Sequence, residues 1–134
     1  MKVQEFKLAT PQEGMIDITA QVRQMLCDSG IYTGLCTVFC PHTTAAITTN
    51  ENADPDVVSD FLLGLGKAYP DRPEFNHCEG NSAAHLKSSA IGCSQTFIIE
   101  EGRLMLGTWQ GIYFCEFDGP RSRRFLVKIM DGNK

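Results

Sequence analysis

The chain has 134 residues, a length typical of one domain with its own hydrophobic core, so we treat residues 1–134 as a single domain. Its formal net charge of −4 argues against nucleic acid as the main partner. It contains no run that approaches the roughly 20 apolar residues of a membrane-spanning helix. We therefore expect neither a nucleic-acid nor a membrane partner.

The six cysteines raise the question of disulfide bonds. The first ten residues contain no apolar run of the length found in a secretory signal, and proteins that are not exported keep their thiols reduced. There is no CxxC pair, and Cys36, Cys40 and Cys115 lie within apolar stretches. We predict six free thiols and a cytoplasmic location.

The first elements follow from apolar spacing and from residues that end helices. We expect a strand over residues 3–8 and a helix over residues 20–28, with Thr19 as its N-cap and Gly30 as its end. Residues 35–40 are apolar on both faces, which is typical of a central strand covered on both sides.

Pro41 follows this strand and cannot donate to a sheet hydrogen bond, so the chain is expected to bend there. The bend presents His42, Thr43 and Thr44 at the end of the sheet, where a site is expected. A second strand then continues to Asn50 and Glu51.

Asp54 and Pro55 predict the start of the main second helix, because aspartate caps free N–H groups and proline fits the first helical position. A loop is expected up to residue 80, followed by a short helix from Asn81 or Ser82 to residue 90. The remainder is predicted to form strands over residues 95–100, 103–110, 112–118 and 124–130. These elements predict an α+β fold: a mixed or antiparallel sheet with two main helices on one side and a short helix near the site.

The three histidines, His42, His77 and His85, each lie at or beside a predicted break. Neutral imidazoles bind zinc and related ions, so a shared site that leaves one coordination position open is one interpretation. The alternative is that each is an ordinary surface or hydrogen-bonded histidine.

Glu51 is a candidate general base, and Asn50 with Glu51 is a candidate group for a metal or a substrate amine. The alternative is a turn that caps the next helix. Gln110 is expected to meet substrate, whereas Trp109 is expected in the core.

Strand alternation places Glu116 and Asp118 on one face, where they either bind a cation or offset the arginines that follow. Arg121 follows a Gly-Pro turn, and its planar guanidinium suits phosphate or carboxylate. Its alternative role is a salt bridge to Glu116 or Asp118. Arg123 and Arg124 are expected to be solvated at a strand edge.

No phosphate-binding loop, dinucleotide fingerprint, serine-nucleophile motif or known cysteine–histidine protease motif is present in the sequence. A serine-triad hydrolase is therefore unsupported.

A family resemblance begins in HTTAA (42–46), Asn50-Glu51 and Asp54-Pro55. It continues in His77, NSAAHLK (81–87), LMLGTWQ (104–110) and EFDGPR (116–121). In these blocks the chain resembles the YjbQ-type family, proposed secondary thiamine-phosphate synthases, over nearly its whole length.

The resemblance implies a small enzyme with weak thiamine-phosphate synthase activity, a transferase that joins a pyrimidine diphosphate to a thiazole phosphate and releases pyrophosphate. It also implies a homotrimer and a small phosphorylated substrate. Two other classes stay open: a metal-dependent hydrolase of a small phosphorylated substrate, and a non-catalytic ligand-binding protein.

The site residues are predicted on the same basis. A divalent ion, zinc or magnesium, is expected on the three histidines. The expected catalytic residues are His42, Glu51 and Arg121, and the expected substrate-binding residues are Thr43, Thr44, Asn50, Asn81 and Gln110.

Overall fold

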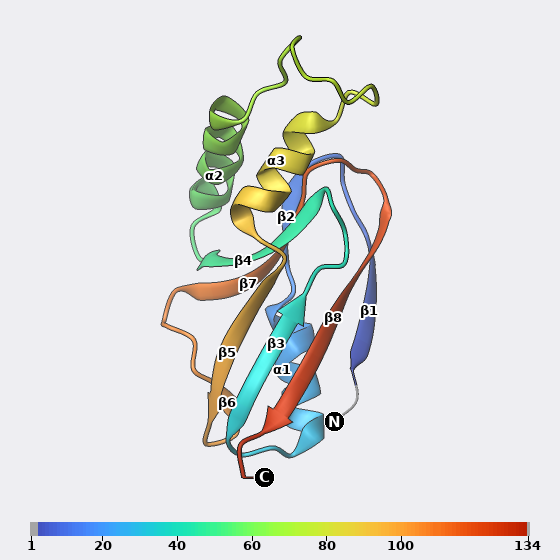
Figure 1. Ribbon diagram of the computed structural model, residues 1–134. Helices are drawn as coiled ribbons and strands as arrows, with labels where there is room; N and C mark the ends of the chain where they lie inside the picture. The colour runs from blue at the N-terminus through green and yellow to red at the C-terminus, as the bar shows by residue number, and fades with distance from the viewer. Residues whose placement is uncertain (1–2, 134) are drawn as a thin grey trace.

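The computed structural model describes residues 3–133, and it contains three helices and eight strands within them (Figure 1). In chain order they are β1 (Gln4–Ala9), β2 (Gly14–Asp17), α1 (Thr19–Ser29), β3 (Gly34–Phe39), β4 (Ala45–Glu51), α2 (Pro55–Ala68), α3 (Ser82–Ile91), β5 (Ser94–Glu100), β6 (Arg103–Leu104), β7 (Gln110–Glu116) and β8 (Ser122–Asp131).

The strands form two antiparallel sheets. The five-stranded sheet has the order β1-β8-β3-β5-β6, and the three-stranded sheet has the order β2-β7-β4. β4 pairs with β7 along its full length, from Ala45 opposite Glu116 to Glu51 opposite Gln110. β3 lies between β5 and β8, as expected of a central strand.

The chain has two hydrophobic clusters. The larger cluster joins α1 to the inner faces of both sheets through side chains such as Val22, Val38 and Phe114. The smaller cluster packs α2 and α3 against the outer face of the three-stranded sheet, around Tyr113 and Cys115. Figure 1 shows α1 behind the five-stranded sheet and α2 beside α3 at the other end. The expectation that both main helices cover one side is therefore wrong, because the three-stranded sheet is covered on both faces.

Two of the predicted helix ends are confirmed, and the predicted N-cap of α1 is wrong. Asp54 caps α2, with its side chain accepting from the N–H of Asp56 at 2.9 Å, and Gly30 ends α1 in a left-handed conformation. Thr19 does not cap α1. Asp17 accepts from the N–H of Thr19 at 2.9 Å, and the Thr19 hydroxyl oxygen accepts instead from the N–H of Ile112 at 2.8 Å.

Three other predictions about burial and strand length are wrong. One face of β3 is open, with Leu35 46% exposed and Phe39 38% exposed. Trp109 is 62% exposed rather than in the core. The strand predicted over residues 103–110 is only Arg103–Leu104, because residues 105–109 leave the sheet before β7 begins.

All six cysteines are unpaired, as predicted. Burial raises the pKa of Cys36 and of Cys40 to about 11, and that of Cys115 to about 12. Within residues 3–133 no helix has the length and apolar character needed to cross a membrane.

Candidate functional site

A buried ion pair joins the two sheets at the end of β7. Arg123 in β8 donates from Nε to Oε1 of Glu116 at 2.7 Å and from Nη2 to Oε2 at 2.5 Å. Glu116 is fully buried and Arg123 is 7% exposed, so the expectation that Arg123 is solvated at an edge is wrong. The pair is possible because both oxygens of the carboxylate meet the planar fork of the guanidinium.

Two threonines complete the hydrogen bonds of this pair. The Thr10 hydroxyl donates to Oε1 of Glu116 at 2.6 Å, and Nη2 of Arg123 donates to the hydroxyl of Thr44 at 2.8 Å. Burial alone would raise the pKa of Glu116, but hydrogen bonds from Arg123, Thr10 and the backbone of Asp118 lower it. The pair is therefore ionised at neutral pH, and its role is to hold the strand ends in place.

The turn after β7 carries an arginine that this framework positions. Arg121 donates from Nε to the carbonyl of Asp118 at 2.7 Å and from Nη2 to its carboxylate at 3.0 Å. Gly119 makes the turn possible, because a side chain there would meet the carbonyl of Pro11 at 1.9 Å. The Arg121 side chain stays 51% exposed, and within residues 3–133 its remaining N–H groups have no partner, so they can bind a ligand.

Asp118 also connects Arg121 to Asn81 at the start of α3. Nδ2 of Asn81 donates to Oδ2 of Asp118 at 2.8 Å. Burial alone would raise the pKa of Asp118, but the bonds from Asn81 and Arg121 lower it. Asp118 thus accepts from both residues as a carboxylate, which makes it a positioning group and not a proton donor. Of the two roles predicted for Glu116 and Asp118, the structure supports the offsetting of arginines.

The other side-chain atom of Asn81 is unpaired. Its Oδ1 is buried and, among residues 3–133, has no hydrogen-bond partner. Asn81 is the N-cap of α3, yet its side chain does not cap the helix; Asp71 accepts from the N–H of Ala83 instead, at 3.3 Å. A buried acceptor without a donor is costly, so this oxygen is suited to a ligand hydroxyl or amine.

His42 lies in the loop between β3 and β4, at the same end of the sheets. Its Nε2 accepts from the backbone N–H of Arg124 at 3.1 Å, and its ring meets that of Phe114 edge-on. Burial and the charge of Arg123 lower its pKa, so the imidazole is neutral at pH 7. Because the lone pair of Nε2 is already used, His42 fits a structural role better than that of a general base.

The other two histidines pair with each other. The ring centroids of His77 and His85 lie 5.2 Å apart at right angles. Within the described chain no group of three or more histidine, cysteine or acidic side chains could hold a metal ion. The predicted metal site of His42, His77 and His85 is therefore wrong for a single chain, because His42 lies against Phe114 and Arg124 instead.

Three predicted site residues lie at the opposite end of the three-stranded sheet. Asn50 and Glu51 end β4, and Gln110 begins β7, where its side chain accepts from the N–H of Gly107 at 2.8 Å. β4 has seven residues, Ala45–Glu51, and its six residue-to-residue steps span about 20 Å at ~3.4 Å per residue. One chain cannot bring Glu51 and Arg121 to the same small ligand.

The spacing of charged and apolar residues in β7 and β8 is itself a sequence signal for the buried pair. Glu116 lies on the same face of β7 as Ile112 and Phe114. Arg123 likewise lies on the same face of β8 as Phe125 and Val127. Charged residues in line with apolar ones on a strand face are expected to be buried and therefore paired.

The family described as "UPF0047 protein YjbQ-like" matches residues 4–132. The chain belongs to this family. It is 57% identical to the UPF0047 protein YugU of Bacillus subtilis over 122 residues, covering 90% of this chain and 92% of that protein. It is 51% identical to the UPF0047 protein MJ1081 of Methanocaldococcus jannaschii over 119 residues, covering 89% and 86%.

Solved structures of the UPF0047 family share the fold. A crystal structure of a Clostridium acetobutylicum protein of this family, described as uncharacterized, has 55% identity and a TM-score of 0.92 and covers 95% of this chain and 99% of that one. A Sulfolobus solfataricus protein, described as YbjQ-like and of unknown function, has 34% identity and a TM-score of 0.92, with coverage of 97% and 96%.

These relatives correct the predicted activity. The relatives bear the name UPF0047, and the two solved structures are described as uncharacterized or of unknown function. None of these descriptions supports a thiamine-phosphate synthase, a transferase of thiamine biosynthesis or a metal-binding protein. We therefore withdraw the predicted synthase activity and the three-histidine metal site, and only the family and fold implied by the resemblance are confirmed.

Proposed function

We propose that the protein binds a small phosphorylated molecule at the Arg121 site, which we define as Arg121, Asn81 and Asp118. The observation that carries the proposal is the unpaired Oδ1 of Asn81, buried beside a carboxylate that also orients a half-exposed arginine. An arginine with free N–H donors and a buried acceptor without a donor are complementary to a phosphate ester that also carries a hydroxyl or amine.

The nearby acidic groups do not oppose an anion at Arg121. A hollow of about 420 Å³ beside the site is lined by Gln12, Glu13, Phe117, Asp118 and Gly119. Glu13 is paired with Nζ of Lys87 at 3.0 Å, and Asp118 is paired with Arg121. Both carboxylates are therefore compensated, Glu13 by Lys87 and Asp118 by Arg121 itself. An anion would bind here through the remaining N–H donors of the guanidinium and not through a net positive charge.

Titration calorimetry with glycerol phosphate as the probe tests the proposal. Arg121→Ala should weaken binding at least about tenfold, because a charge-assisted bidentate contact is lost. Arg121→Lys should recover only part of the affinity, because a lysine keeps the charge without the fork. Arg124→Ala is the matched control, since Arg124 is also half exposed and paired with a carboxylate, that of Glu5 at 2.9 Å.

Unchanged affinity in Arg121→Ala together with a lowered melting temperature would assign Arg121 to the fold alone. The exposed pair with Asp118 would then contribute about 1 kcal/mol or less to stability.

We also propose that the protein acts as an enzyme on the phosphate ester that it binds, and we assign no reaction type. Glycerol phosphate, incubated with the protein and followed by phosphorus NMR, should show turnover that Arg121→Ala abolishes. If glycerol phosphate remains unchanged, ligand binding is the role of the site.

A cytoplasmic location also stays a prediction, and the six unpaired cysteines support it.

The homotrimer is likewise a proposal. It is supported by the open face of the five-stranded sheet, where Ile98, Leu35 and Met130 lie side by side on β5, β3 and β8, and each is at least 46% exposed. Three adjacent apolar side chains are typical of a covered surface. Sedimentation equilibrium should give three times the chain mass of 14.8 kDa, and Leu35→Lys should lower it. A monomer at all concentrations would contradict the proposal.

A further inference from the structure

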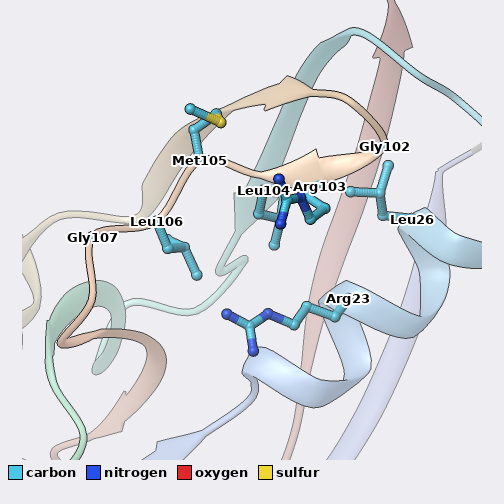
Figure 2. Close-up of a pocket in the computed structure, with 8 residues that line it drawn as sticks. All are labelled: Arg23, Leu26, Gly102, Arg103, Leu104, Met105, Leu106 and Gly107. Atoms are coloured by element: carbon cyan, nitrogen blue, oxygen red, sulfur yellow. The ribbon is translucent and has the colours of Figure 1, made fainter.

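A groove of about 790 Å³ lies between α1 and the segment that follows the β5–β6 turn. Arg23 and Leu26 of α1 line one side, and residues 102–107 line the other (Figure 2). Figure 1 places β6 and α3 at opposite ends of the molecule, so this groove is separate from the Arg121 site.

The floor of the groove is apolar and fixed. Leu26 is 3% exposed and Leu104 is 8% exposed, and both belong to the larger hydrophobic cluster, against which Leu106 also packs. Met105 stands at the rim and is largely exposed. The apolar surface of the groove is therefore continuous with the hydrophobic core on one side and reaches solvent at Met105 on the other.

The charged lining is entirely positive. Arg23 and Arg103 are the charged residues among those that line the groove, and neither forms an ion pair within the described chain. Figure 2 shows the guanidinium of Arg23 reaching from α1 toward Leu106. Arg23 also lines an adjacent hollow, together with Asp17 and Asn52.

Asp17 forms no ion pair with Arg23 within residues 3–133. Its carboxylate accepts from the N–H of Thr19 at 2.9 Å and from Nδ2 of Asn52 at 3.1 Å. Burial alone would raise its pKa, but these hydrogen bonds and, after them, the charge of Arg23 lower it. The guanidinium of Arg23 therefore keeps its donors for another partner.

We propose that this groove binds a small amphiphilic anion, with the anionic group between Arg23 and Arg103 and the apolar part against Leu26, Leu104 and Leu106. In a chain of net charge −4, a concave surface with two arginines and no acidic lining is selective for negative charge. The guanidinium groups supply planar pairs of donors suited to phosphate, sulfonate or carboxylate. The leucines supply the apolar contact that a purely inorganic anion lacks.

Hexyl phosphate, hexylammonium and inorganic phosphate are the probes that separate these contributions. Titration calorimetry measures binding, and the fluorescence of Trp109, the one tryptophan of the chain, which is exposed and lies two residues beyond the groove in the sequence, is followed in parallel. Hexyl phosphate should bind, inorganic phosphate should bind at least about tenfold more weakly, and hexylammonium should not bind.

Two variants test the charge and one tests the floor. Arg23→Gln and Arg103→Gln should each weaken hexyl phosphate about tenfold or more. Leu106→Ser should weaken hexyl phosphate but leave inorganic phosphate unchanged. Arg72→Gln is the matched control, since Arg72 is an exposed arginine of the loop before α3, outside the groove.

The outcomes separate this proposal from the Arg121 site. Arg121→Ala should leave the binding of hexyl phosphate unchanged. Equal binding of hexylammonium and hexyl phosphate, or wild-type affinity in both groove arginine variants, would overturn the proposal. Loss of binding in Arg121→Ala alone would assign the bound anion to the other site and also overturn it.

Discussion

Arg123 and Glu116 form a buried, two-point ion pair that joins the five-stranded sheet to the three-stranded one, with Nη2 of Arg123 2.5 Å from Oε2 of Glu116. Removal of one partner leaves an uncompensated charge away from water, whereas removal of both leaves only an apolar contact. The pair also fixes Thr44 and the strand end from which Asp118 and Arg121 follow.

Arg123→Met should therefore lower the free energy of unfolding by about 3–5 kcal/mol, since it leaves the Glu116 carboxylate buried without its counter-charge. The double variant Glu116→Leu, Arg123→Met should be more stable than either single variant. Urea denaturation measures all three. Arg124→Met is the control and should cost about 1 kcal/mol or less, because the pair of Arg124 with Glu5 is exposed. Additive losses in the double variant would contradict this account.

His42 should make stability depend on pH as the pH falls through about 6.5, the usual pKa of histidine, and below it. Its pKa in the folded protein lies below the usual 6.5, chiefly because of burial, so the unfolded chain takes up a proton first as the pH falls. Its contribution to stability is fully present above pH 6.5 and is lost below it. His42→Gln should flatten the slope of unfolding free energy against pH in this range. A slope in His42→Gln that equals that of the wild type would contradict this account.

Asn81→Ala should have little effect on the stability of the free protein, within about 1 kcal/mol, because it removes one hydrogen bond and one unpaired buried acceptor together. The same change should lower the stabilisation gained from added glycerol phosphate. Melting curves with and without the ester measure both quantities. A large loss of stability without the ester would show that Oδ1 of Asn81 already has a partner in solution.

Thiol titration should separate the cysteines into two groups of three. Cys27, Cys78 and Cys93 are exposed and should react with an aromatic disulfide reagent at pH 7.5 within minutes. Cys36, Cys40 and Cys115 are buried with raised pKa values, about 11, 11 and 12, and should react only on unfolding. Fewer than six reactive thiols in denaturant would contradict the unpaired state.

The sequence alone was sufficient wherever one residue and its near neighbours decide the conformation. Asp54 and Pro55 predicted the start of α2, and Gly30 predicted the end of α1, because capping and left-handed geometry are local properties. The alternation of apolar residues predicted most strands and hence the α+β class. The motif blocks predicted the family, and the family match over residues 4–132 confirms it.

Tertiary structure decided which charged groups are buried and which site residues meet. Arg123 is charged and has polar neighbours in the sequence, which predicts exposure. It is nevertheless buried, because the carboxylate of Glu116 from the other sheet accepts two hydrogen bonds from its guanidinium. Glu51 and Arg121 are both predicted for one site from the sequence, but the pairing of β4 with β7 holds them at opposite ends of the three-stranded sheet. Strand pairing brings together or separates residues according to register, and register depends on contacts between segments far apart in the chain.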